Sequence, residues 1–119
     1  MQKTNSSLVK WLNLARAIRE AAPFNDLTAD EEQLLEDLIV RWHHAATLTV
    51  SDIMYVNQRS TPSTAYRRLV ALKNKGLVTV TVDTHDKRMR LVAATPKAQE
   101  YMTRLAQGLD TLKRKAKPA

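Results

Sequence analysis

The sequence contains no cysteine, and only two of its 119 residues are glycine. The absence of thiols excludes disulfides, thiolate catalysis and cysteine-based zinc sites. Scarce glycine argues against long irregular segments, and no glycine-rich phosphate-binding loop occurs. The chain has no stretch of about 20 continuous apolar residues, and its N-terminal segment lacks the apolar core of a secretory signal. We therefore expect a single-domain cytoplasmic protein without disulfides.

Catalytic and metal-binding patterns are missing as well. No nucleophile–base pattern is present, and paired carboxylates occur only at the exposed start of a predicted helix over 29–45. His43 and His44 are adjacent, on different faces of that helix, with no carboxylate or cysteine at ligand spacing. The sequence therefore predicts neither an enzyme nor a cofactor or metal site.

Positive charge is concentrated behind the middle of the chain. Residues 1–57 hold five lysines and arginines against eight acids, whereas residues 58–97 hold nine against two. The whole chain carries a net charge of +7. An excess of one sign on one part of a protein is typical of a surface that binds a polyanion.

Helical periodicity predicts one helix over 7–22 and another over 29–45. Thr28 and Glu31 have the spacing of a capping box at the start of the second helix. Two shorter helices follow, over 50–57 and 62–75, and the polar turn between them favours a helix-turn-helix.

Local signals mark the ends of these two short helices. Thr49 and Asp52 repeat the capping spacing for the first, and Thr61 caps the second ahead of a proline. Gly76 is placed to end the second helix, whose buried face is predicted to be Ala65, Leu69 and Leu72.

Alternating apolar residues predict two strands, over 77–82 and 89–94, joined by the charged turn VDTHDKRMR. A last helix over 96–113 follows. This order predicts a mainly α fold with a small β-hairpin (α+β), a winged helix-turn-helix. We expect one domain over 1–119, with a DNA-binding core over 28–95 between the two terminal helices.

A helix that enters the DNA major groove contacts bases through its N-terminal turns. In the helix over 62–75, Arg67 lies off the core face, and it can donate two hydrogen bonds to a guanine or to a phosphate. The other predicted DNA-contacting residues are polar or basic and belong to this helix, the turn before it and the hairpin: Arg59, Ser60, Thr61, Ser63, Thr64, Tyr66, Arg68, Lys87, Arg88 and Arg90. The alternative is that these are solvated polar faces without a ligand.

Two stretches resemble MarR-type bacterial transcriptional regulators, and the resemblance covers about residues 28–105. STAYRRLVALKNKGLV is similar to the family's recognition helix, and VDTHDKRMRLVAATPKA is similar to its wing. The resemblance implies that Arg88 reaches a minor groove and that Asp86 orients it. The chain departs from the pattern at Arg68, Ala94 and Ala98, and has room for one C-terminal helix where the family usually has two.

The terminal helices carry apolar stripes that a small winged domain has no obvious place to bury. We expect them to form a homodimer interface, and the resemblance implies the same. The predicted interface residues are Leu8, Trp11, Leu12, Tyr101, Leu105 and Leu109. The alternative is that these residues belong to an ordinary core. The resemblance also implies a small aromatic effector, for which Trp42 and Tyr55 would line a cleft or else be core residues.

The sequence thus predicts a dimeric DNA-binding regulator, associated with the nucleoid, that recognises a pseudo-palindromic site. The alternative is a winged-helix module for replication, plasmid maintenance or protein interaction that has no specific operator. The sequence does not identify the operator, the regulated genes or the sign of regulation.

Overall fold

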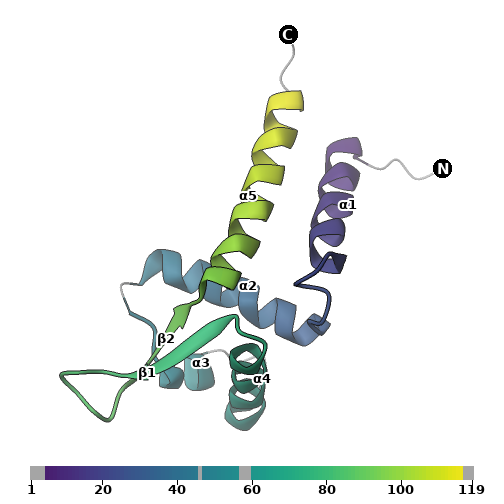
Figure 1. Cartoon of the computed structure of the whole chain (residues 1–119). Helices are drawn as coiled ribbons and strands as arrows, with labels where there is room; N and C mark the ends of the chain where they lie inside the picture. The colour runs from purple at the N-terminus through teal and green to yellow at the C-terminus, as the bar shows by residue number, and fades with distance from the viewer. Residues whose placement is uncertain (1–4, 46, 57–59, 117–119) are drawn as a thin grey trace. The chain divides into compact units, whose positions relative to one another are not determined.

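The structure, a computed structural model, describes residues 5–45, 47–56 and 60–116. The described chain forms five helices and one hairpin in the order α1 (Ser6–Glu20), α2 (Ala29–His44), α3 (Val50–Val56), α4 (Pro62–Asn74), β1 (Val78–Val82), β2 (Arg90–Ala94) and α5 (Pro96–Ala116) (Figure 1). This is the predicted mainly α fold with a small β-hairpin, and each helix boundary lies within a few residues of its predicted position.

Contacts divide the chain into two compact units. One unit comprises Thr28–Gln99, and the other comprises the residues up to Leu27 together with those from Glu100 onward. The predicted DNA-binding core over 28–95 therefore falls within the first of these, here called the winged unit. The second, here called the terminal-helix unit, contains α1 and most of α5.

Capping boxes begin α2 and α3, as predicted. The Thr28 hydroxyl accepts the Glu31 N–H at 3.2 Å, while the Glu31 carboxylate accepts the Thr28 N–H at 3.0 Å. Thr49 and Asp52 make the same reciprocal pair, at 3.0 and 3.1 Å. Each box satisfies N–H groups that the first turn of a helix leaves without backbone partners.

Both ends of α4 have the predicted caps. The Thr61 hydroxyl accepts the Thr64 N–H at 3.2 Å, and Pro62 occupies the first turn. At the other end Gly76 has φ +80°, its N–H bonds the Lys73 carbonyl, and the Leu77 N–H bonds the Leu72 carbonyl, both at 3.0 Å. This paired arrangement is a Schellman motif, which needs a residue with positive φ. The helix was predicted to end at Lys75, but its last residue is Asn74, and Lys75 takes the cap position.

The core of the winged unit lies where α2, α3, α4 and the hairpin meet. The predicted inner face of α4 is buried, with Ala65, Leu69 and Leu72 at most 3% exposed. The other buried apolar residues are Leu34, Leu35, Leu38, Leu48, Val50, Ile53, Leu77, Val78, Val92 and Ala98. This shared core connects α4 and the hairpin to the same scaffold.

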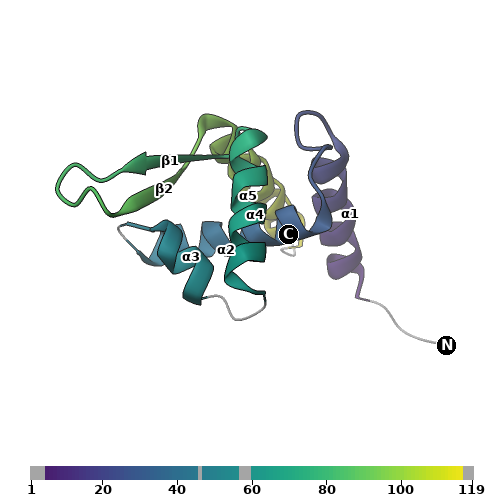
Figure 2. The same cartoon turned by 90° about the horizontal axis from the view of Figure 1, so that it is seen from below.

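The hairpin is antiparallel, and its register runs from Val78 opposite Ala94 to Val82 opposite Arg90. Thr49 forms an additional bridge to Leu91, and the Val92 N–H donates to the Leu48 carbonyl at 2.8 Å. The start of α3 is thereby attached to β2. In both views the loop of the hairpin extends away from α3 and α4 (Figures 1 and 2).

In the terminal-helix unit, α1 and α5 lie side by side (Figure 1). Tyr101 is fully buried there, packs edge-on against Phe24 with ring centroids 5.0 Å apart, and accepts a hydrogen bond from Arg19 Nε at 3.3 Å. The prediction that Tyr101 contributes to a dimer surface is therefore wrong, because its side chain is enclosed within its own chain. None of the described helices is both long and apolar enough to cross a membrane.

Candidate nucleic-acid interface

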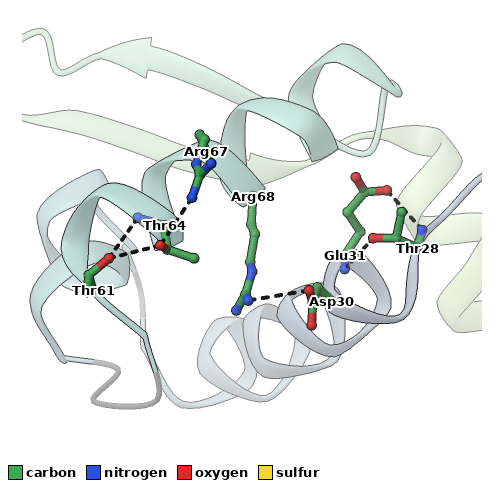
Figure 3. Close-up of polar contacts among 7 residues, drawn as sticks. All are labelled: Thr28, Asp30, Glu31, Thr61, Thr64, Arg67 and Arg68. Atoms are coloured by element: carbon green, nitrogen blue, oxygen red, sulfur yellow. Dashed lines mark hydrogen bonds and ion pairs between the residues drawn. The ribbon is translucent and has the colours of Figure 1, made fainter.

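The first two turns of α4 present a cluster of hydroxyls beside an exposed guanidinium (Figure 3). The Thr61 hydroxyl donates to Thr64 Oγ1 at 2.9 Å and lies 3.4 Å from Ser63 Oγ. Arg67 Nη2 donates to Thr64 Oγ1 at 3.3 Å. No acidic residue occupies the first turn of α4, so no side chain of that turn neutralises the positive end of the helix dipole. Hydroxyls, helix N–H groups and a guanidinium together suit an anionic ligand such as a phosphate.

The tip of the hairpin is ordered by its two aspartates. The Asp83 carboxylate accepts the Asp86 N–H at 3.3 Å, and the Asp83 N–H donates to the Met89 carbonyl at 2.9 Å. Asp86 Oδ1 in turn accepts both the N–H of Arg88, at 3.0 Å, and its Nε, at 3.2 Å. These contacts close the turn without glycine, and they hold the base of an arginine side chain that is 92% exposed.

A groove of about 680 Å³ joins α4 to the hairpin within the winged unit. Tyr66 lines it from α4, and Arg88, Met89 and Arg90 line it from the hairpin. Its remaining wall comes from α3 and the residues before it: Thr47, Thr49, Val50, Ser51, Asp52 and Met54. Tyr66 is 40% exposed, and Lys87 is exposed at the hairpin tip. The structure thus brings together predicted contact residues that are more than 20 positions apart in sequence.

Two predicted contact residues, Arg68 and Ser60, lie beside α2 and do not line this groove. Arg68 extends from α4 toward α2, where its Nη2 lies 3.4 Å from Asp30 Oδ2 (Figure 3). Ser60 lies with Arg68 and Asp30 in a small hollow between the two helices. Arg59 falls outside the described residues.

A buried carboxylate at the start of α2 was missed by the sequence reasoning, which placed all of this acidic turn in solvent. Glu31 is only 8% exposed, and its Oε1 accepts a hydrogen bond from Lys75 Nζ at the end of α4. Burial by itself raises the pKa of Glu31, but hydrogen bonds from Lys75 and Thr28 and the attraction of the Lys75 ammonium outweigh it, so the pKa is lowered. The capping box indicated that Glu31 folds back over the helix end, but nothing local indicated Lys75.

The two aromatic residues predicted to line an effector cleft differ in their surroundings. Trp42 Nε1 donates to the Val92 carbonyl at 3.0 Å, so its indole connects α2 to β2. Tyr55 is 68% exposed on α3. Among the predicted interface residues, Leu8, Leu12 and Leu109 are 53%, 51% and 42% exposed, while Trp11 and Leu105 are half-buried.

No protein-family model matches the chain. No curated protein matches it either. Several solved structures are similar to it. One is a MarR-like transcriptional regulator from Thermotoga maritima, with TM-score 0.64, 15% identity, and 95% of this chain and 81% of that chain covered.

Two further solved structures are similar. A mutant of MarR from E. coli, complexed with operator DNA, has TM-score 0.56 and 21% identity over 91% of this chain and 74% of that chain. BpsR from Bordetella bronchiseptica, whose DNA binding is regulated by 6-hydroxynicotinic acid, has TM-score 0.53 and 16% identity. The match covers 96% of this chain and 83% of that chain. At these identities the likeness concerns the fold, and the chain has the winged helix-turn-helix fold of MarR-type transcriptional regulators.

Proposed function

We propose that this protein is a dimeric, sequence-specific DNA-binding transcriptional regulator, and not an enzyme. The observation that carries the proposal is the groove shared by Tyr66 of α4 and the hairpin arginines Arg88 and Arg90. Its cationic residues are exposed, and the segment that holds them has a large excess of positive charge. A regulator of the same fold has been solved with operator DNA, which supports DNA as the polyanion.

In this proposal α4 enters a major groove by its N-terminal turns. Arg67 reads a guanine edge, and Ser63, Thr64 and the helix N-terminus hold a phosphate. Tyr66 contacts a sugar or a thymine methyl group. Phosphate contacts also come from Arg59, Ser60, Thr61, Lys87 and Arg90, and from Arg68, whose guanidinium donates to a phosphate while it stays paired with Asp30.

The hairpin acts as the wing. Arg88 enters the neighbouring minor groove, where a narrow groove concentrates negative potential. Asp86 repels phosphate, so its place at this surface needs a reason. Its contacts with the backbone and side chain of Arg88 supply one, because a side chain restrained in advance loses less entropy on binding.

Dimerisation is proposed to use the terminal helices. Leu8 and Leu12 of α1 are about half exposed, and a groove of about 420 Å³ in the same unit is lined partly by Trp11, Leu109 and Leu112. A second copy would bury this apolar surface and place two α4 helices on half-sites about 34–36 Å apart. We further propose that a small aromatic molecule modulates DNA binding in the cytoplasm, on the precedent of BpsR.

Selection from a genomic fragment library at a fixed, stated salt concentration tests the main proposal. We expect enrichment of one short inverted repeat. Uniform weak binding, or none, would instead favour a replication, plasmid-maintenance or protein-interaction module.

Two variants then test the assignment of residues. Arg67→Ala should lose about 1–3 kcal/mol on the selected site and relax the base preference at one position. Lys87→Ala should weaken binding to all sequences alike, because a phosphate contact carries no sequence information. Equal affinities of Arg67→Ala and wild type for the selected site would remove Arg67 from the base-reading role.

A further inference from the structure

Two ion pairs connect α4 to the first turn of α2. Arg68 pairs with Asp30 at 3.4 Å, and Lys75 pairs with Glu31. The two acids are neighbours in sequence. The two bases are seven residues apart, about two helical turns, so Lys75, the C-cap residue, continues the stripe of α4 that carries Arg68. The face of α4 that carries these bases is therefore held against α2 at two points along its length.

The pair of Lys75 with Glu31, at the C-terminal end of α4, is more buried than the other pair, and more hydrogen bonds surround it. The side chains of Lys75 and Glu31 are 25% and 11% exposed, against 32% and 63% for Arg68 and Asp30. The carbonyl of Lys75 also accepts a hydrogen bond from Lys97 Nζ at 2.8 Å, and the Gly76 carbonyl accepts one from Thr95 Oγ1 at 2.6 Å. Lys75 is thus fixed through its side chain and its backbone.

The position of α4 matters because Arg67 directly precedes Arg68. Adjacent helix residues are separated by about 100° of rotation and 1.5 Å of rise. Holding Arg68 and Lys75 against α2 therefore fixes the direction in which Arg67 leaves the helix. Figure 3 shows Arg67 and Arg68 leaving α4 in different directions. A contact that discriminates between bases must be placed within about 0.5 Å and 10–20°.

We propose that Glu31, assisted by Asp30, is a positioning residue that fixes the rotation and axial position of α4 and thereby the base selectivity of Arg67. This inference rests on the proposed function. Two simpler accounts compete with it. The acids could act only by repelling DNA, in which case removing one tightens binding to every sequence. They could also act only on stability, in which case the folded protein keeps its selectivity.

Full-length Glu31→Gln separates these accounts. Glutamine at this position still accepts the Thr28 N–H in a capping box, but it loses the charge that attracts Lys75. Glu20→Gln is the matched control, because it removes one carboxylate charge from an exposed site on α1. For each protein, the dissociation constants for the selected site and for a scrambled duplex are measured at the same salt concentration.

If Glu31 positions α4, Glu31→Gln should lower the ratio of specific to non-specific affinity by about tenfold. Glu20→Gln should leave this ratio unchanged. Lys75→Gln should lower the ratio like Glu31→Gln, Lys75→Arg should retain most of it, and the double variant Glu31→Gln with Lys75→Gln should lose no more than either alone. An unchanged ratio in Glu31→Gln, or an equal rise in affinity for both duplexes, would overturn the proposal.

A measurement without DNA keeps this test distinct from that of the proposed function. Amide hydrogen exchange should show faster exchange in α4 of Glu31→Gln than in Glu20→Gln, at a temperature where both remain folded. If wild type prefers no sequence, the proposed function fails while this comparison still reports on α4. If α4 exchanges alike in both variants, Glu31 does not hold it and the inference fails.

Discussion

At the scale of single residues, Glu31 has two partners that act on the same carboxylate. It closes the capping box of α2 with Thr28 and accepts a hydrogen bond from Lys75. Its pKa in the folded protein is lowered from the usual value of 4.5. A carboxylate with a lowered folded pKa contributes stability above its unfolded pKa, and this contribution disappears as the pH falls through the folded pKa.

Glu31→Gln should therefore destabilise the protein at neutral pH and change the shape of its acid unfolding. We expect a loss of about 1.5 kcal/mol at pH 7, the typical contribution of a hydrogen bond to a charged group. The difference in free energy of unfolding between wild type and variant should be constant above about pH 5 and shrink below about pH 4.5. Urea unfolding of both proteins from pH 7 to pH 3 measures it. A difference that stays constant down to pH 3 would contradict the lowered pKa.

At the scale of elements, the end of α4 depends on one backbone conformation. Gly76 has φ +80°, and a Cβ built there would meet nothing nearer than Lys97 Cδ at 3.9 Å. The space around Gly76 therefore accommodates a side chain, and the obstacle is the left-handed backbone itself. Gly76→Ala should lower the free energy of unfolding by about 1–2 kcal/mol, and Gly76→Asn by less, because asparagine tolerates this region better. Equal stability of the alanine variant and wild type in urea would show that α4 ends in another way.

The element boundaries were predictable because their causes are local. The caps at Thr28, Thr49 and Thr61 are made to residues three positions away, and the turn of the hairpin is closed by its own Asp83 and Asp86. The same short range explains why the predicted contact between Asp86 and Arg88 is present in the structure.

Long-range contacts were not predictable in the same way. The Lys75–Glu31 pair spans 44 positions, and the contact of Arg19 with Tyr101 spans 82. The periodicity of α5 placed Tyr101 correctly on an apolar stripe but gave no indication whether its partner was its own chain or a second copy. The bridge of Thr49 to Leu91 was missed because the alternating run over 47–50 is only four residues long, and Thr49 was interpreted only as the cap of the helix that follows.

At the scale of the whole molecule, the exposed leucines of the terminal-helix unit lead us to expect that two copies of the chain associate through this unit. Leu12 on α1 is 51% exposed. Val40 on α2, in the winged unit, is 58% exposed and serves as a control, because it is also an exposed apolar residue on a helix. An apolar side chain in a dimer interface tolerates a carboxylate poorly, because the charge would be buried without a partner. The same change at a solvated position has little effect on stability.

Leu12→Glu should therefore convert a dimer into a monomer at micromolar concentration, and Val40→Glu should not. Sedimentation velocity over a range of protein concentrations measures this, and the thermal unfolding of both variants reports whether each still folds. Because two half-sites are engaged together only by a dimer, Leu12→Glu should also lose affinity for an inverted repeat while retaining that for a single half-site. If Val40→Glu dissociates the dimer and Leu12→Glu leaves it intact, the interface lies on the winged unit, and the exposed leucines of α1 need a different partner.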